Sequence, residues 1–594
     1  MKNRSELKRV CMLLILFTII GMVYAYPDIR FILVSGKQYK GIGLTGTSEE
    51  LLYLSRINGI YKGSINLSDI YCFEHQNDPW FRPFIGEFIT GNIGKLLKIS
   101  VVALDILASA ILNIVLSFLI FIFSYQLSKS TRLSIIISFA IMLGYNILTA
   151  NVSTLKEIFI AGNYAIPLWF LRPLSPQFYY ITFFVALIYI NRATNISASA
   201  NRTDIAKAKA IAIAIAGVTL GLLFYCNVYY WTFIYAGLGI LFLFFISKKE
   251  RKSALSIVYI YAVSIIIAIP YFISVFKVIN HPAYEYLQKN YMMVNSHKVF
   301  LYIPYVIPAV FIIILLLILK HESRLFIASF LIGGIICLNQ QVVTGKIMLQ
   351  QWSFYTNKTF LIISIIVSVK LIFTEAIKLK FIRYINFINS NLSKTVLSGI
   401  TVLFFILTAF LQQNNYYRRN KEYFLEKQKL AGAYKWLREN TDKDDVVLTD
   451  PYQDFSNHLT NYRFLLTYTD NFSYIAEPAC MLISEQEVVY RILASLIFLG
   501  YSEDDMEKYI NIIKQVYKSA DPYIWIYPPS EDYFKMLRTE YKALGQENPI
   551  DALKKYKTDY ILIENEVANK LARKYSNNLM TAYKDTDYTV FALN

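Results

Sequence analysis

Two adjacent carboxylates, Glu49 and Glu50, stand at the start of an amphipathic stretch with the sequence TGTSEELLYLSRINGIYKG (residues 45–63). A carboxylate beside a substrate can act as a general base, because it takes the proton of a hydroxyl group while that oxygen attacks an electrophilic carbon. A structural role is the alternative, since Thr47 and Glu50 have the spacing of a capping box in the first turn of a helix. Glu49 is not needed for that cap, so capping favours Glu49 as the base.

Four more ionisable residues follow in the N-terminal part of the chain. Glu74, His75 and Asp78 offer oxygen and imidazole ligands that could hold a divalent metal ion. Their spacing is not that of a recognised metal motif, and a solvated loop is the alternative. Asp105 lies early in a long apolar segment, where a carboxylate is costly unless it is paired or faces a cavity. These four residues are candidates for supporting the carboxylate pair or for holding a metal ion.

Two cations have surroundings that suit phosphate binding. Arg172 lies in WFLRPLSPQFYY, and Lys346 lies in NQQVVTGKIMLQQW. Arginine can hold a phosphate group through two parallel hydrogen bonds, and lysine acts on it as a point charge. Cations that merely anchor a helix at the membrane surface look the same in sequence. The chain has no glycine-rich nucleotide loop, Walker motif or Ser-His-Asp signature, which argues against a nucleotide-driven pump.

The elements that must position these side chains are membrane helices. The chain has 594 residues, of which 55% are hydrophobic, and its mean hydropathy of +0.39 is seldom reached by a soluble protein of this size. Its long apolar runs are each near the roughly 20 residues that a helix needs to cross about 30 Å of hydrocarbon. We predict eleven spans, near residues 9–27, 100–126, 133–150, 177–191, 208–226, 228–247, 253–277, 300–319, 325–340, 359–377 and 395–412.

The net charge of +17 indicates membrane topology rather than nucleic-acid binding. Lys and Arg cluster in short loops between the apolar runs, and such loops stay in the cytoplasm. The basic N-terminus is then cytoplasmic, and its apolar run is expected to be an uncleaved anchor rather than a signal peptide. Eleven crossings place the first loop (residues 28–99) and everything after residue 412 on the extracytoplasmic side. The loops that contain Arg172 and Lys346 also fall outside.

The last part of the chain, residues 413–594, changes character. Charged residues become frequent, LAGAYKWLREN and SEDDMEKYINIIKQVYKSA predict helices, and DVVLTD, TDYILIEN and DYTVFAL predict strands. About 180 residues are enough for a core of their own. We therefore expect a polytopic α-helical membrane domain (residues 1–412) followed by an extracytoplasmic soluble α/β domain (residues 413–594). The five cysteines form no disulfide framework and no zinc motif.

This layout resembles the GT-C superfamily of membrane glycosyltransferases, which includes protein O-mannosyltransferases, oligosaccharyltransferase catalytic subunits and aminoarabinose transferases. The local similarity lies in four places: the acidic pair that opens a helix in TSEELLYLSRINGIYKG, the RPLSPQF loop, the QVVTGKIMLQ loop, and the tail with WLRENTDKDDVVLTD and KYKTDYILIEN. The usual acidic residue of the superfamily is aspartate, where this chain has two glutamates. Trp352 stands near the place of a histidine in a late loop of the family.

The resemblance implies a fold of about eleven transmembrane helices and transfer of a sugar from a polyprenyl-phosphate carrier to an acceptor on the outer face. The central acidic role falls on Glu49 or Glu50, which would take the proton of an acceptor hydroxyl. Arg172, Lys346 or a bound divalent metal ion would hold the developing charge of the departing phosphate. The expected partners are the lipid-linked donor, a glycan, lipid or protein acceptor, and the membrane, with no nucleic acid.

Two other functions are compatible with many spans and a lipid-linked sugar. An O-antigen polymerase or ligase usually has its working residues in a large central external loop, whereas the largest external segments here are the first loop and the tail. A transporter or flippase for lipid-linked glycans would tend to show repeat symmetry and broken helices with polar residues at mid-membrane. Neither feature is evident in this sequence.

Overall fold

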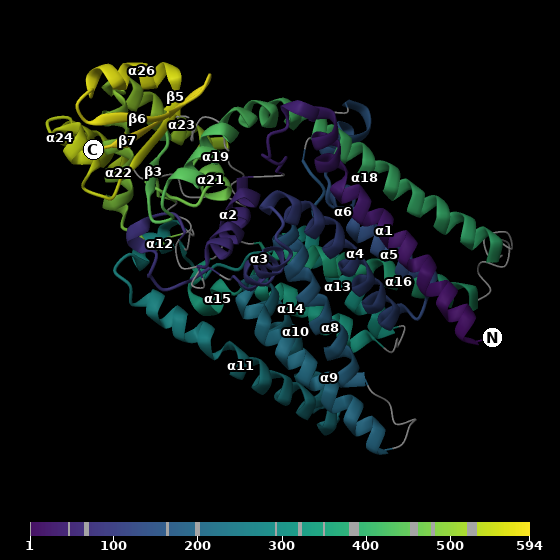
Figure 1. Cartoon of the computed structure of the whole chain (residues 1–594). Coiled ribbons are helices and arrows are strands. Elements are labelled where there is room, and N and C mark those ends of the chain that lie inside the picture. The colour runs from purple at the N-terminus through teal and green to yellow at the C-terminus, as the bar shows by residue number, and fades with distance from the viewer. Residues whose placement is uncertain are drawn as a thin grey trace.

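The chain folds into a helical bundle and a smaller domain that contains a sheet (Figure 1). The computed structural model describes residues 2–45, 48–64, 70–82, 84–161, 166–195, 202–290, 294–318, 323–347, 351–378, 391–451, 461–476, 481–519 and 531–594. In Figure 1 the C-terminal domain lies at one end of the bundle, next to α2 (Ser48–Lys62).

Eight helices in the described part of the chain are long and apolar enough to span a membrane, which makes this a multi-pass membrane protein. They are α1 (Lys2–Ser35), α4 (Val101–Ser128), α8 (Tyr179–Asn195), α9 (Arg202–Leu222), α10 (Val228–Ser247), α11 (Arg251–Ile279), α16 (Lys358–Lys378) and α18 (Asn391–Lys427). Three shorter apolar helices are α5 (Thr131–Met142), α13 (Ile303–Ile318) and α14 (Arg324–Leu338). At 1.5 Å per residue, these three are about 18 to 24 Å long, less than the hydrocarbon thickness. Each predicted span coincides with one of these helices.

Close contacts between helices form the core of the bundle. A Cβ added to Gly333 of α14 would lie 2.6 Å from the backbone nitrogen of Gly237 in α10, so the two helices touch at their glycines. The central helix α4 packs against α1, α5 and α8. Phe123 of α4 contacts three rings from other helices: Phe184, Phe326 and Phe360.

The helix α18 continues past the expected domain boundary at residue 412. It has 37 residues and ends at Lys427. The segment after residue 412 contains no Gly or Pro that would stop a helix. Its aromatic residues Tyr416 and Phe424 are buried against the rest of the protein. One continuous helix therefore leads from the membrane bundle into the C-terminal domain.

The segment between α1 and α4 contributes α2, as expected from the sequence, and the amphipathic helix α3 (Ile85–Leu97). Leu54 and Ile57 on one side of α2 are buried. Gly91 of α3 lies against Ile60 of α2 with no room for a side chain, since an added Cβ would be 3.0 Å from the Cβ of Ile60. Leu96 of α3 is 82% exposed and lies on the side away from α2. The first loop is thus a packed pair of helices that fixes the direction of α2.

A buried ion pair joins these two helices. Arg56 Nε lies 3.0 Å from Glu87 Oε1, and the two side chains are 6% and 1% exposed. We expect Arg56→Ala to destabilise the protein by about 3 to 5 kcal/mol, because it leaves the Glu87 carboxyl buried without a partner. Thermal unfolding in detergent measures this change. The apolar pair Arg56→Met with Glu87→Leu should restore most of the lost stability, and equal stability of the wild type and Arg56→Ala would contradict this role.

The C-terminal domain is built on a five-stranded mixed sheet with the order β4-β3-β5-β7-β6. The strands are β3 (Val446–Leu448), β4 (Phe472–Ser473), β5 (Tyr560–Glu564), β6 (Leu579–Lys584) and β7 (Tyr588–Leu593). β3 runs parallel to β4 and β5, and β7 is antiparallel to both β5 and β6. The helices are α19 (Ala431–Asn440), α21 (Asn461–Tyr468), α22 (Glu485–Leu499), α23 (Glu503–Ser519), α24 (Glu531–Leu544), α25 (Pro549–Leu553) and α26 (Asn565–Lys574).

The predicted strands at β3, β5 and β7 and the predicted helices at α19 and α23 are all present. Strand β4, which is only two residues long, and the edge strand β6 were not predicted from the sequence. Neither was α22, whose run of buried residues from Val488 to Leu499 shows little contrast between its faces. A C-terminal α/β domain is therefore confirmed, with more helices than the sequence indicated.

Candidate active site

The helix that carries Glu49 and Glu50 is held by the C-terminal domain. Thr467 of α21 donates its hydroxyl to the carbonyl oxygen of Leu51 at 3.3 Å. Asn58 of α2 donates to the carbonyl oxygens of Leu466 and Thr469 at 2.9 and 2.6 Å. The first turn of α2 is therefore fixed beside α21. Thr47, the other half of the expected capping box, lies outside the described residues.

Glu49 and Arg172 form an ion pair across the site, in which Arg172 Nη1 contacts Glu49 Oε2. Arg172 precedes the π-helical turn η4 (Pro173–Phe178), which leads into α8. The side chain of Glu49 is 49% exposed, whereas that of Arg172 is 13% exposed. Arg172, and more weakly Arg82 and Arg463, lower the pKa of the Glu49 carboxyl. Glu49 is thus a carboxylate that an incoming molecule can reach. Its ion pair engages the guanidinium of Arg172.

Glu50 faces the interior of the protein. It is 4% exposed and lies near Asp28 of α1 and Asp105 of α4, each of which is 8% exposed. The carboxyl groups of Glu50 and Asp105 lie close enough to interact with each other. The hydroxyl of Tyr416 in α18 donates to the carbonyl oxygen of Thr45 at 2.6 Å next to this group. The structure thus places Asp105 beside one of the two predicted catalytic residues.

Asp28 was not identified from the sequence. The predicted first span ended at residue 27, so Asp28 fell into the predicted first loop (residues 28–99). In the structure, α1 continues through Pro27 to Ser35, so Asp28 is inside a helix and buried. A carboxylate in a helix that crosses or borders the hydrocarbon is costly without a partner, and that cost would have been the signal.

Glu74, His75 and Asp78 face the C-terminal domain instead of Glu49. Glu74 Oε2 lies 2.7 Å from Arg491 Nη2. His75 Nδ1 lies 2.7 Å from Asp78, and its Nε2 lies 3.2 Å from Glu487 of α22. Within the described ranges, no three His, Cys, Asp or Glu side chains are arranged to hold a metal ion. These contacts attach the segment of residues 70–82 to the sheet domain.

Arg491 is the centre of that attachment. Its side chain is fully buried, binds both Glu74 and Glu487, and lies 3.9 Å from the centre of the Tyr556 ring. We expect Arg491→Ala to cost about 2 to 3 kcal/mol, because two partly buried carboxylates lose their cation. Limited proteolysis should then cut within residues 70–82. Arg573→Ala, at an exposed position of the same domain, is the matched control, and an unchanged cleavage rate in Arg491→Ala would contradict the attachment.

Lys346 is placed differently from Arg172. It lies on β2 (Lys346–Ile347), which pairs with β1 (Val294–Asn295). Its amino group donates to Gln288 of α12 (Tyr284–Asn290) at 3.3 Å. No contact that the structure describes joins Lys346 to Arg172 or Glu49. Trp352 is buried and donates to Thr232 at 2.8 Å.

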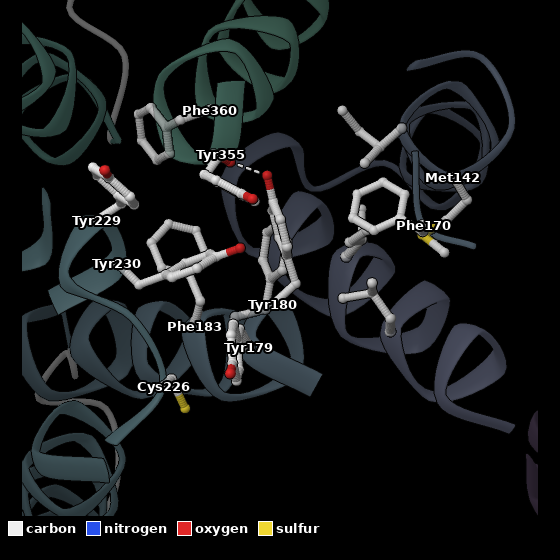
Figure 2. Packing of buried hydrophobic residues seen from close by; sticks show 14 of the residues in the cluster. Met142, Phe170, Tyr179, Tyr180, Phe183, Cys226, Tyr229, Tyr230, Tyr355 and Phe360 are labelled. Atoms are coloured by element: carbon white, nitrogen blue, oxygen red, sulfur yellow. Dashed lines mark hydrogen bonds between the residues drawn. The ribbon is translucent and has the colours of Figure 1, made fainter. Parts of the chain in front are cut away.

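A cluster of aromatic side chains lies next to Arg172. The Tyr355 side chain lies near the guanidinium of Arg172. Figure 2 shows the ring of Tyr355 among those of Tyr229, Tyr230 and Tyr180, and Tyr180 donates its hydroxyl to the Tyr355 carbonyl oxygen. The ring centres of Tyr229 and Tyr230 lie 5.9 and 5.8 Å from that of Tyr355. These residues come from α8, α10 and the π-helical turn η6 (Ser353–Asn357), so three segments fix the position of the Tyr355 ring.

Three residues near Glu49 were missed as site residues: Tyr355, Arg82 and Arg463. The two arginines carry a signal that the sequence contains. Both lie in segments assigned to the outer side, where the positive-inside pattern gives no reason for basic residues. Tyr355 carries no such signal, because its aromatic neighbours in the chain are ordinary core residues.

Comparison with known proteins gives likenesses in structure only. No family model matches the chain, and no curated protein matches it in sequence. Among solved structures, it is similar to the oligosaccharyltransferase AglB of Archaeoglobus fulgidus in complex with an inhibitory peptide and a dolichol-phosphate, with 11% identity, a TM-score of 0.45, and coverage of 98% of this chain and 74% of that one.

A second structure of the Archaeoglobus fulgidus oligosaccharyltransferase, tethered with an acceptor peptide, gives 13% identity, a TM-score of 0.46 and the same coverage. ArnT of Cupriavidus metallidurans in the apo state gives 11% identity and a TM-score of 0.42, with coverage of 95% of this chain and 97% of that one. These solved structures belong to the GT-C superfamily that the sequence resembles.

Proposed function

We propose that this protein is an integral-membrane glycosyltransferase that moves a sugar from a polyprenyl-phosphate donor to an acceptor. The observation that carries the proposal is the pairing of Glu49 with Arg172. A half-exposed carboxylate that can act as a general base lies in contact with a largely buried cation that can bind phosphate, next to a bundle of apolar helices. Those two groups are what attack by a hydroxyl on a sugar phosphate requires.

In the proposed reaction, Glu49 accepts the proton of the acceptor hydroxyl as that oxygen bonds to the anomeric carbon. The bond between the anomeric carbon and the phosphate oxygen breaks, and its electron pair stays on the polyprenyl phosphate. Arg172 stabilises the charge that develops on this leaving group. The acceptor can reach Glu49, which is half-exposed, whereas Glu50 is buried beside Asp105. Glu49 is therefore the base, and Glu50 with Asp105 fixes the first turn of α2.

The ion pair also links donor binding to the readiness of the base. While Arg172 holds Glu49, the pKa of the carboxyl is low and Glu49 is a weak base. A phosphate group competes for the same guanidinium and releases Glu49 from it. The base thus becomes stronger when the donor is in place. The site is proposed to face the extracytoplasmic side, together with the C-terminal domain, and the N-terminus to face the cytoplasm.

Purified protein in sealed proteoliposomes separates this function from that of a flippase. The vesicles carry a fluorescent polyprenyl-phosphate sugar in both leaflets, together with a soluble acceptor outside. A transferase consumes the donor of one leaflet and leaves polyprenyl phosphate behind. Movement of intact donor between leaflets without loss of its sugar would support the flippase and would overturn the proposal.

A further inference from the structure

The chain just before Arg172 runs through the interior of the bundle without forming a helix. Residues 166–172 belong to no helix or strand, and Phe170 and Leu171 are 0% and 4% exposed. A backbone carbonyl group in such a place has no helical partner and must be hydrogen-bonded by other groups. For Phe170 and Leu171, these other groups are side chains.

Three buried side chains donate to these two carbonyl oxygens. Gln177 of η4 uses its amide nitrogen for both, and its hydrogen bond to the oxygen of Leu171 is 3.1 Å long. From α4, Asn113 donates to the oxygen of Phe170 at 3.1 Å, and the hydroxyl of Ser109 donates to that of Leu171 at 3.1 Å. Gln177 and Asn113 are 0% exposed and Ser109 is 3% exposed. Each carbonyl oxygen thus has two side-chain donors, one for each lone pair.

These hydrogen bonds fix the backbone from which the Arg172 side chain extends. The carbonyl group of Leu171 and the nitrogen of Arg172 belong to one planar peptide unit, so bonds to that oxygen also set the orientation of the next residue. On the other side, Pro173 restricts Arg172 to an extended conformation, which it adopts with φ −77° and ψ 122°. The backbone of Arg172 is therefore held on both sides, and its guanidinium contacts Glu49.

A purely structural role is the alternative, because irregular backbone inside a membrane bundle must be hydrogen-bonded in any case. One donor for each carbonyl oxygen would meet that need, and two are present. Ser109 and Asn113 are four residues apart and so lie on one face of α4. Polar side chains are costly in an apolar membrane helix unless they are bonded. The doubled donors favour a role in fixing one position of the chain.

We propose that Gln177, together with Ser109 and Asn113, positions Arg172 for the phosphate group of the donor. These three residues do not touch the donor but act through the backbone of the preceding segment. The inference rests on the proposed function. A guanidinium group that is already in place can form two parallel hydrogen bonds to a phosphate without first losing conformational freedom. The same contacts keep Arg172 on Glu49 before the donor binds.

The variant Gln177→Leu removes two of the four hydrogen bonds and keeps a side chain of similar size. It should raise the Kd of polyprenyl phosphate in nanodiscs about three- to tenfold. It should also move the acid side of the profile of kcat/KM against pH to higher pH, because Arg172 is the largest cause of the lowered pKa of Glu49. In the background of Arg172→Ala, Gln177→Leu should change the Kd by less than about twofold, since the positioned group is gone.

Two further variants show whether the effect is specific. Asn191 of α8 is buried and donates to Gln126 of α4 at 3.0 Å. Asn191→Leu therefore breaks an amide hydrogen bond between the same two helices, about 20 Å along α8 from Gln177, and should leave the Kd and the pH profile unchanged. Ser109→Ala should act in the same direction as Gln177→Leu, but more weakly. Ser109→Thr keeps the hydroxyl group and should behave as the wild type.

The outcomes separate this inference from the proposed function. If Arg172→Ala weakens binding of polyprenyl phosphate and Gln177→Leu leaves the Kd and the pH profile unchanged, the inference is overturned and the proposed function stands. Equal effects of Asn191→Leu and Gln177→Leu would also overturn it, because both would then only loosen the bundle. If Arg172→Ala does not weaken binding, both proposals fall. If Gln177→Leu unfolds in a thermal melt, Ser109→Ala decides, and wild-type behaviour of that variant would overturn the inference.

Discussion

Replacing Glu49 with Gln lowers the rate of sugar transfer by roughly 10²- to 10⁴-fold, because the amide cannot accept the proton of the acceptor hydroxyl. The substitution keeps the size of the side chain. It also releases Arg172 from its ion pair, so the donor should bind at least as tightly as in the wild type. The measurement is kcat with a polyprenyl-phosphate sugar, together with the Kd of the donor in nanodiscs.

Two comparisons make this result specific. Glu50→Gln should be much less damaging, because Glu50 is buried and acts through Asp105, while the double variant should be as inactive as Glu49→Gln alone. Glu439→Gln on the exposed surface of α19 serves as the control for expression and insertion. Full loss of transfer in Glu50→Gln with retained activity in Glu49→Gln would assign the base to Glu50.

Replacing Arg172 with Ala raises the KM for the donor by about 10- to 100-fold and lowers kcat, because the phosphate loses a charged hydrogen-bond donor in both the bound and the departing state. Arg172→Lys should recover only part of this loss, since the ammonium group cannot bond to two phosphate oxygens in parallel. Unchanged donor affinity in Arg172→Ala would reduce Arg172 to an anchor at the membrane surface.

The same variant changes the pH dependence of the reaction. Glu49 acts as a base only when it is deprotonated, so activity falls as the pH drops through its pKa. Arg172 is the largest cause of the lowered pKa of Glu49. Without Arg172 that pKa rises, and the acid side of the profile of kcat/KM against pH should move to higher pH. An unmoved profile, or one displaced to lower pH, would show that Glu49 is not the titrating base.

The membrane helices could be predicted from the sequence because each depends on its own residues. Long apolar runs mark the spans without knowledge of any neighbour. The end of α18 was harder to place, because the segment after residue 412 is polar in sequence and is buried only by packing of Tyr416 and Phe424. Strand β4 has too few residues to show a period, and its pairing with β3 is a tertiary contact.

In the candidate site, too, some features could be predicted from local sequence and others depend on the fold. Glu49 and Glu50 could be selected because two carboxylates at a helix start are a local pattern. Their different roles could not, since only the fold turns one toward Arg172 and the other toward Asp105. The partner of Glu74 is Arg491, more than 400 residues later, and no local pattern indicates such a contact. The lowering of the Glu49 pKa by arginines from separate parts of the chain likewise depends on how the domains pack.

The most direct test of sugar transfer at Glu49 follows three molecules together by mass spectrometry. Protein in nanodiscs is incubated with a polyprenyl-phosphate sugar and an acceptor that has a free hydroxyl. For the wild type, we expect loss of donor, gain of polyprenyl phosphate and gain of glycosylated acceptor in equal amounts, and for Glu49→Gln none of the three. An unchanged donor with the wild type, or equal yields from the wild type and Glu49→Gln, would contradict catalysis at this residue.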